Sequence, residues 1–154
     1  MKINYILIPL IVLAVSVGGS LLTNSGMPWY DTLKLPSIAP PGGVIGAVWT
    51  VIFILSTISA IMLWNVAPRG MQFNLIFSLF AINAILNVLW SFFFFNQQMI
   101  GASIIEMCVL NLTTLALIIF GWRFSWIAAS LLIPYFAWVS FATYLAYKIW
   151  ILNL

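Results

Sequence analysis

The side chains of this protein that are able to do chemistry are aromatic rings and amides rather than acids and bases. Its 154 residues include 8 Trp, 5 Tyr and 12 Phe, but no His, one Asp and one Glu. Neither a Ser-His-Asp triad nor a His-ligated metal site can be assembled from that set. A carboxylate pair would need Asp31 in a loop to meet Glu106 inside an apolar segment, which their placement opposes. We therefore expect no metal and no required cofactor, and a ligand held by aromatic contacts with a few polar anchors.

Three apolar segments carry such side chains at helical spacing, on one face each. The residues are Asn83, Asn87, Trp90 and Phe94 in one segment, Trp138, Phe141, Ala142 and Leu145 in another, and Trp49 and Phe53 in a third. Because an amide that faces lipid is costly, the face with the two asparagines must point into a helix bundle. These faces either line one aromatic pocket or pack together with the amides bonded to neighbouring helices, and spacing alone leaves both interpretations open.

Glu106 is the single acid inside an apolar segment. Such a residue marks a functional site by default. The alternative is that it pairs with Ser, Thr or Asn of a neighbouring helix or extends toward the membrane surface. We favour the alternative, because no apolar segment contains a basic residue that could form a proton relay with Glu106.

The elements that position these residues are five long apolar segments. The chain is 65% hydrophobic, with only five Lys or Arg and two Asp or Glu. About 20 apolar residues cross a hydrocarbon layer about 30 Å thick, and the stretches 3–22, 44–64, 73–95, 100–120 and 125–147 meet that length. The sequence predicts an all-α integral membrane protein, a five-transmembrane-helix bundle that forms a single domain over residues 1–154.

Two of the five segments contain a proline. Pro9 and Pro134 lie inside the first and fifth segments, where we expect them to kink the helices. Such prolines are tolerated in a membrane because neighbouring helices satisfy the carbonyls that they leave free.

The first segment follows Lys2, as the core of a signal peptide would follow its basic residues, but its length exceeds the roughly 7–15 residues of a signal-peptide core. We expect it to be retained as a membrane span.

The distribution of cations predicts the orientation. Five spans put the two termini on opposite sides of the membrane, with Lys2, Arg69 and Arg123 on the N-terminal side and Lys34 and Lys148 on the other. Since cytoplasmic loops carry the excess of Lys and Arg, we expect a cytoplasmic N-terminus. The net charge of +3 is spread over the loops without a basic run, so nucleic acid is not an expected partner.

The connection 23–43 between the first two segments is much longer than the others. Pro36, Pro40 and Pro41 stiffen it, and Trp29 and Tyr30 suit a membrane interface. Loops of this length in compact proteins are usually functional. We expect it to fold over one end of the bundle as a capping lid, and the alternative is an interfacial anchor without a ligand.

Four motifs in the chain together resemble one protein family. They are Trp29-Tyr30-Asp31-x-Leu33-x-x-Pro36-x-x-x-Pro40-Pro41, Gly46-x-x-Trp49, Asn83-x-x-x-Asn87-x-x-Trp90-Ser91 and Pro134-Tyr135-x-x-Trp138-x-x-Phe141-Ala142. In this order and at these spans, the sequence resembles the TspO/MBR family, which includes the tryptophan-rich sensory proteins of bacteria and the translocator protein of mitochondria. One departure is Ala146, where many members have Asn, and sterol binding is therefore not expected.

The resemblance implies a homodimeric five-helix receptor in a bacterial cell membrane. Its ligands would be tetrapyrroles such as protoporphyrin IX, together with synthetic isoquinoline-carboxamides and benzodiazepines, bound under the first loop. Carried over by motif, the pocket residues are Tyr30, Pro40, Pro41, Trp49, Phe53, Asn83, Asn87, Trp90, Trp138, Phe141 and Ala142. The resemblance also implies light- and oxygen-dependent breakdown of bound porphyrin, with Trp49 and Trp138 as the catalytic residues.

Three functions stay open on the sequence. The first is a porphyrin-binding sensor that also degrades its ligand in light. The second is a transporter, or transport partner, for porphyrins or other apolar molecules, and the third is a non-catalytic interaction subunit of the membrane.

Overall fold

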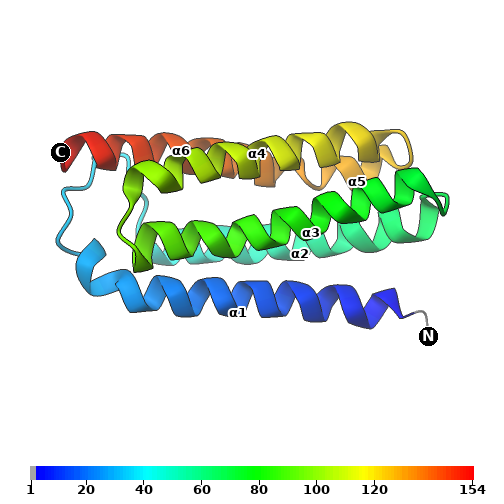
Figure 1. Ribbon diagram of the computed structural model, residues 1–154, viewed down its shortest axis with the longest axis horizontal. Coiled ribbons are helices and arrows are strands. Elements are labelled where there is room, and N and C mark those ends of the chain that lie inside the picture. The colour runs from blue at the N-terminus through cyan, green and yellow to red at the C-terminus, as the bar shows by residue number, and fades with distance from the viewer. Residues whose placement is uncertain (1–2) are drawn as a thin grey trace.

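The computed structural model describes residues 3–154 as an antiparallel helix bundle. Its elements, in chain order, are α1 (Asn4–Tyr30), α2 (Gly42–Val66), α3 (Met71–Ser91), the π-helix η1 (Phe92–Asn96), α4 (Ile100–Trp122), α5 (Trp126–Ser130) and α6 (Ile133–Leu152). The long helices run side by side along one axis, α1 lies along one edge of the bundle, and the chain ends lie at opposite ends of it (Figure 1). Successive long helices run in opposite directions, but they do not all pack on each other, since α1 packs on both α2 and α3, α3 packs on α4, and α4 packs on α6.

Five spans of this bundle are long and apolar enough to cross a membrane. They are α1, α2, α3 with η1, α4, and α5 with α6, with mean hydropathies from 1.5 to 2.3 over their best windows. Large apolar side chains cover the outside of the bundle, among them Ile85 and Leu112, which are 61% and 64% exposed. In a bilayer these side chains face lipid rather than water. The predicted five-helix integral membrane bundle is confirmed.

The first helix is longer than predicted. We expected it to end at residue 22 and the lid to begin at residue 23, but α1 continues to Tyr30 and the lid shortens to residues 31–41. The helix tolerates Ser25 because its hydroxyl donates to the carbonyl of Leu22 at 2.7 Å. Gly26 does not end the helix but lets it approach η1, since a Cβ at this position would overlap the backbone of Phe95.

The third span ends in a wider helical turn than an α-helix. In η1 the amide of Gln97 donates to the carbonyl of Phe92 at 2.8 Å, five residues back. The extra residue per turn shifts the register of the side chains that follow. Phe94 and Phe95 lie within this turn and are both buried, 3% and 8% exposed.

The fifth span is two helices instead of one kinked helix. Pro134 lies in the first turn of α6, after a break at Leu131 and Leu132 that separates it from α5. Proline is tolerated there because the first turn of a helix has no use for its missing N–H. The prediction of a kink inside a continuous helix 125–147 was wrong for this reason. Pro9 lies inside α1, as the sequence indicated.

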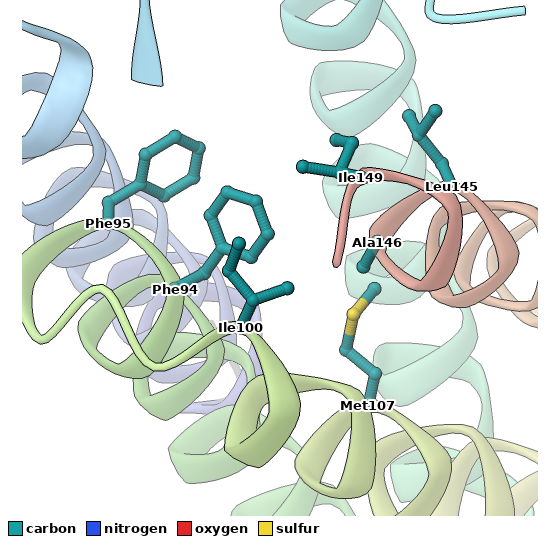
Figure 2. Close-up of a cluster of buried hydrophobic side chains, with 7 residues drawn as sticks. All are labelled: Phe94, Phe95, Ile100, Met107, Leu145, Ala146 and Ile149. Carbon is teal, nitrogen blue, oxygen red and sulfur yellow. The ribbon is translucent and has the colours of Figure 1, made fainter. Parts of the chain in front are cut away.

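Buried side chains tie four of the five spans into one frame. At the lid end, side chains from α3 with η1, from α4 and from α6 point toward one another, as Figure 2 shows. They are Phe94, Phe95, Ile100, Met107, Leu145, Ala146 and Ile149. A second cluster around Leu63, Leu117 and Leu132 closes the other end. The fully buried part of α1 is limited to Asn4, Ile8 and Gly26, so α1 lies against this frame more than it forms part of it.

Candidate functional site

A cavity of about 490 Å³ opens at the lid end of the bundle, between α1, α2, α3 with η1, and α6. This volume is within the range of roughly 300–1,000 Å³ typical of small-molecule sites. Within residues 3–154, the helices α4 and α5 add no side chain to the lining. Helix α4 instead packs behind α3 and α6 and holds those walls in place, while α5 packs on α2 and α4.

Trp49 is the centre of an aromatic wall. Its ring stacks on that of Trp90, with the ring centroids 6.1 Å apart and the planes 29° apart, and its ring centroid lies 5.6 Å from that of Phe53. From α6, Trp138 and Phe141 add a second pair of rings at 5.6 Å. All five residues line the cavity. Such a set of rings offers flat apolar area suited to a planar conjugated ligand.

The two asparagines of α3 have different positions. Asn87 lines the cavity and its Nδ2 donates to the hydroxyl of Tyr135 at 2.9 Å, and that hydroxyl donates to Oδ1 of Asn83, also at 2.9 Å. Nδ2 of Asn83 then donates to Thr113 and Thr114 of α4. The amide of Asn83 is therefore used fully within the bundle, whereas within residues 3–154 no side chain donates to Oδ1 of Asn87.

Most of the predicted pocket residues meet around the cavity. Those that line it are Tyr30, Trp49, Phe53, Asn87, Trp90, Trp138, Phe141 and Ala142. Asn83, Pro40 and Pro41 do not. Asn83 is behind Tyr135, as described above. Pro41 is the residue that precedes α2, and its carbonyl accepts from the amides of Val44 and Ile45, so the Pro40-Pro41 pair starts a helix instead of forming a wall.

A polar wall from α1, which the sequence had not predicted, also lines the cavity. It consists of Ser16, Ser20, Thr23 and Asn24, which all line the cavity. Their spacing of i, i+4, i+7 and i+8 is that of one helix face, and this signal could have found them. It was overlooked because the first helix was ended at residue 22, which put Thr23 and Asn24 in the lid.

The lid, residues 31–41, is attached to the end of α6. The amide of Lys34 donates to Oδ1 of Asn153 at 3.0 Å, and Nδ2 of Asn153 donates back to the carbonyl of Lys34 at 3.0 Å. Leu33 and Ala39 pack against the buried cluster at this end of the bundle. The loop therefore covers the end of the bundle at which the cavity lies.

Glu106 does not have the partners that we expected. It is only 7% exposed, and neither of its carboxyl oxygens has a hydrogen-bond partner within residues 3–154. It therefore neither pairs with a polar side chain of those residues nor extends to the surface. Glu106 also lies outside the cavity lining.

Residues 3–154 contain no group of three His, Cys, Asp or Glu residues that could hold a metal ion.

The chain is similar in sequence to proteins of one known family. The model of the TspO/MBR family matches residues 6–151. The tryptophan-rich protein TspO of Bacillus cereus is 39% identical over 125 residues, which cover 81% of this chain and 80% of that protein. Protein CrtK of Rhodobacter capsulatus is 30% identical over 125 residues (81% and 78%), and the translocator protein of Homo sapiens is 28% identical over 143 residues (87% and 80%). This multi-pass integral membrane protein therefore belongs to the TspO/MBR family.

Proposed function

We propose that this protein is a membrane receptor that binds tetrapyrroles such as protoporphyrin IX in the cavity beneath the lid. The observation that carries the proposal is the aromatic wall, in which Trp49, Trp90 and Trp138 line one cavity of about 490 Å³. A conjugated macrocycle is planar and largely apolar, so it stacks on such rings while the surrounding side chains exclude water.

Light-dependent breakdown of the bound porphyrin is the chemistry that this lining supports. The porphyrin absorbs the light, dioxygen is the oxidant, and the indoles of Trp49 and Trp138 are oxidisable side chains beside the ligand. Such a reaction requires neither a general acid nor a general base. Among residues 3–154, no Asp, Glu, Lys or Arg lines the cavity, which agrees with a reaction that depends on the ligand's own photochemistry.

Two tryptophan substitutions test both parts of the proposal. Protoporphyrin IX should quench the tryptophan fluorescence of the purified protein saturably, and illumination in air should bleach the bound porphyrin. We expect Trp49→Phe and Trp138→Phe to slow bleaching at least fivefold, because phenyl rings are harder to oxidise than indoles, while the affinity falls only a few-fold. Trp126→Phe is the matched control, since Trp126 is 62% exposed and outside the lining.

The outcomes separate the alternatives. If both cavity variants kept the parent protein's affinity and bleaching rate, the cavity would not be the porphyrin site. Absence of saturable quenching in the parent protein would favour an interaction subunit. Porphyrin flux into liposomes above the protein-free leak would favour transport, and tight binding without flux would favour a receptor.

A further inference from the structure

A second cavity lies beneath the first half of α1 and adjoins the first cavity at Phe53 and Asn87, which line both. Its volume is about 190 Å³, and its walls come from α1, α2 and α3, with Tyr135 added from α6. Tyr135 is bonded to Asn83 and Asn87 of the same lining, and Ser56 is the fourth polar residue there. The other lining residues of the described chain are aliphatic or aromatic, so the second cavity suits an apolar occupant.

The second cavity lies between two points at which α1 is held to the rest of the bundle. Near the start of α1, Nδ2 of Asn4 donates to Oδ1 of Asn65 on α2 at 3.4 Å. Near its end, Gly26 packs on η1. In between, Leu7 and Ile11 line the second cavity although they are 42% and 49% exposed. The second cavity is therefore a cleft between α1 and the frame, and it is open to the lipid-facing outside of the bundle.

The length of the second cavity matches one leaflet of a bilayer. Phe53 and Trp64 are the first and last residues of α2 in its lining, and at about 1.5 Å per residue they are about 16 Å apart along the helix. The hydrocarbon layer of a membrane is about 30 Å thick, so each leaflet takes up about 15 Å of it. The volume is less than half that of the first cavity. These dimensions suit a single hydrocarbon chain and not a macrocycle.

A cation lies at the end of the second cavity that is nearest the membrane surface. Trp64 lines that end, and the guanidinium carbon of Arg69 is 4.8 Å from the centroid of its ring and 4.0 Å from that of Phe73. The rings attract the positive charge but contribute no acceptor, so the N–H groups of Arg69 stay available. The acids among residues 3–154 are Asp31, in the lid, and Glu106, which has no hydrogen-bond partner there, so neither neutralises Arg69.

We propose that the second cavity and Arg69 together bind an anionic phospholipid of the membrane. One acyl chain lies in the second cavity, and the phosphate accepts hydrogen bonds from the guanidinium of Arg69. A basic side chain at the membrane surface favours an anionic headgroup, and arginine suits a phosphate because its N–H groups form a planar fork. The bound chain fills the cleft and stabilises the packing of α1. This inference does not depend on the proposed tetrapyrrole function.

Competition between two lipids tests the headgroup. The protein, stripped of lipid in a non-ionic detergent, is given equal amounts of palmitoyl-oleoyl phosphatidylglycerol and palmitoyl-oleoyl phosphatidylcholine, and native mass spectrometry measures which lipid stays bound. The two lipids have the same acyl chains, so the ratio of the bound forms reports the headgroup. We expect phosphatidylglycerol to be favoured roughly fivefold, the effect of one cation on an anionic headgroup.

Variants of Arg69 test the charge. Arg69→Gln should abolish the preference for phosphatidylglycerol, and Arg69→Lys should retain most of it. Arg123→Gln is the matched control, because Arg123 is an exposed cation in the connection after α4, and this variant should leave the preference unchanged.

Variants of α3 test the chain. Ala84→Phe fills the second cavity and should reduce the binding of both lipids severalfold. Ile85→Phe should not reduce it, since Ile85 is 61% exposed and lies outside the lining. Arg69 is exposed, so its variants test the site even if Ala84→Phe fails to fold.

The results can overturn the site in three ways. An equal ratio of the two lipids in the parent protein, or an unchanged ratio in Arg69→Gln, would remove the role of Arg69. Undiminished binding in Ala84→Phe would show that the acyl chain lies elsewhere. If oleate displaced phosphatidylglycerol at equal concentration, the occupant would be a free fatty acid instead of a phospholipid. None of these measurements uses a porphyrin, so failure of this inference leaves the proposed function unaffected.

Discussion

One hydroxyl group, that of Tyr135, decides how the two asparagines of α3 are used. It accepts from Asn87 and donates to Asn83, and both amides and the tyrosine are buried. The spacing of the asparagines had predicted a shared inward face and left open whether they pack or line a pocket. The structure divides them, because Asn83 also reaches two threonines of α4 while Asn87 faces the cavity.

Removal of that hydroxyl should destabilise the protein. Tyr135→Phe leaves Oδ1 of Asn83 without a donor and Nδ2 of Asn87 without an acceptor, and a buried polar group that loses its partner costs about 1–3 kcal/mol. We expect a lower midpoint of thermal unfolding in detergent. Tyr144→Phe is the control, because Tyr144 is 49% exposed and its ring remains available to Lys148. An unchanged midpoint for Tyr135→Phe would show that the hydroxyl does not hold the two amides.

The element that most determines the cavity is α1, which packs against the frame through glycine. Its extension to Tyr30 brings Thr23, Asn24 and Met27 from the expected lid into the cavity wall. The extended part of α1 packs on η1, where the backbone of Phe95 lies directly against Gly26. The close approach of these two elements seals one side of the cavity.

A pair of glycine substitutions tests this contact. Gly26→Ala puts a methyl group into the backbone of η1, which cannot give way as a flexible side chain would, so we expect a loss of about 1–3 kcal/mol, typical of overpacking. Gly46→Ala has open space around its Cβ and should be neutral or stabilising by up to about 1 kcal/mol, because alanine favours the helix. Thermal unfolding of both variants in one detergent gives the comparison. Equal midpoints for the two would contradict the close approach of α1 to η1.

At the scale of the whole molecule, the cations gather at the two ends of the bundle. Arg69 and Arg123 lie in the connections after α2 and α4, where Arg69 is also held over the rings of Trp64 and Phe73. Lys34 and Lys148 lie at the other end, with the lid. We propose, from the positive-inside rule, that the N-terminal end is cytoplasmic and that the lid and the mouth of the cavity face the opposite side.

Cysteine labelling in intact cells tests this orientation. Cys108 is the single cysteine, so Cys108→Ala gives a cysteine-free background. In that background Ser37→Cys in the lid should react with a membrane-impermeant maleimide added outside intact cells. Gln72→Cys at the start of α3 should react only after the membrane is permeabilised. The reverse pattern would place the N-terminus outside, and the cavity would then open toward the cytoplasm.

The membrane location, the five spans and most of the aromatic wall could be predicted from the sequence. These features follow from local properties, since hydropathy over about 20 residues identifies a span and helical spacing puts Trp49 with Phe53, or Trp138 with Phe141, on one face. The family motifs added the expectation that these faces meet around one ligand.

Which side chains on those faces reach the cavity depends on how the helices pack. Residues 24–26 were expected in the lid, but they are helical and Gly26 packs on η1. Asn83 lies on the same face as Asn87 but is taken by Tyr135 and α4, and the Pro40-Pro41 pair starts a helix. The first two outcomes depend on partners distant in sequence, whereas Pro41 is bonded to Val44 and Ile45, three and four residues further along the chain. Spacing along one helix specifies a direction around its axis, whereas the group that lies there is set by how the helices pack.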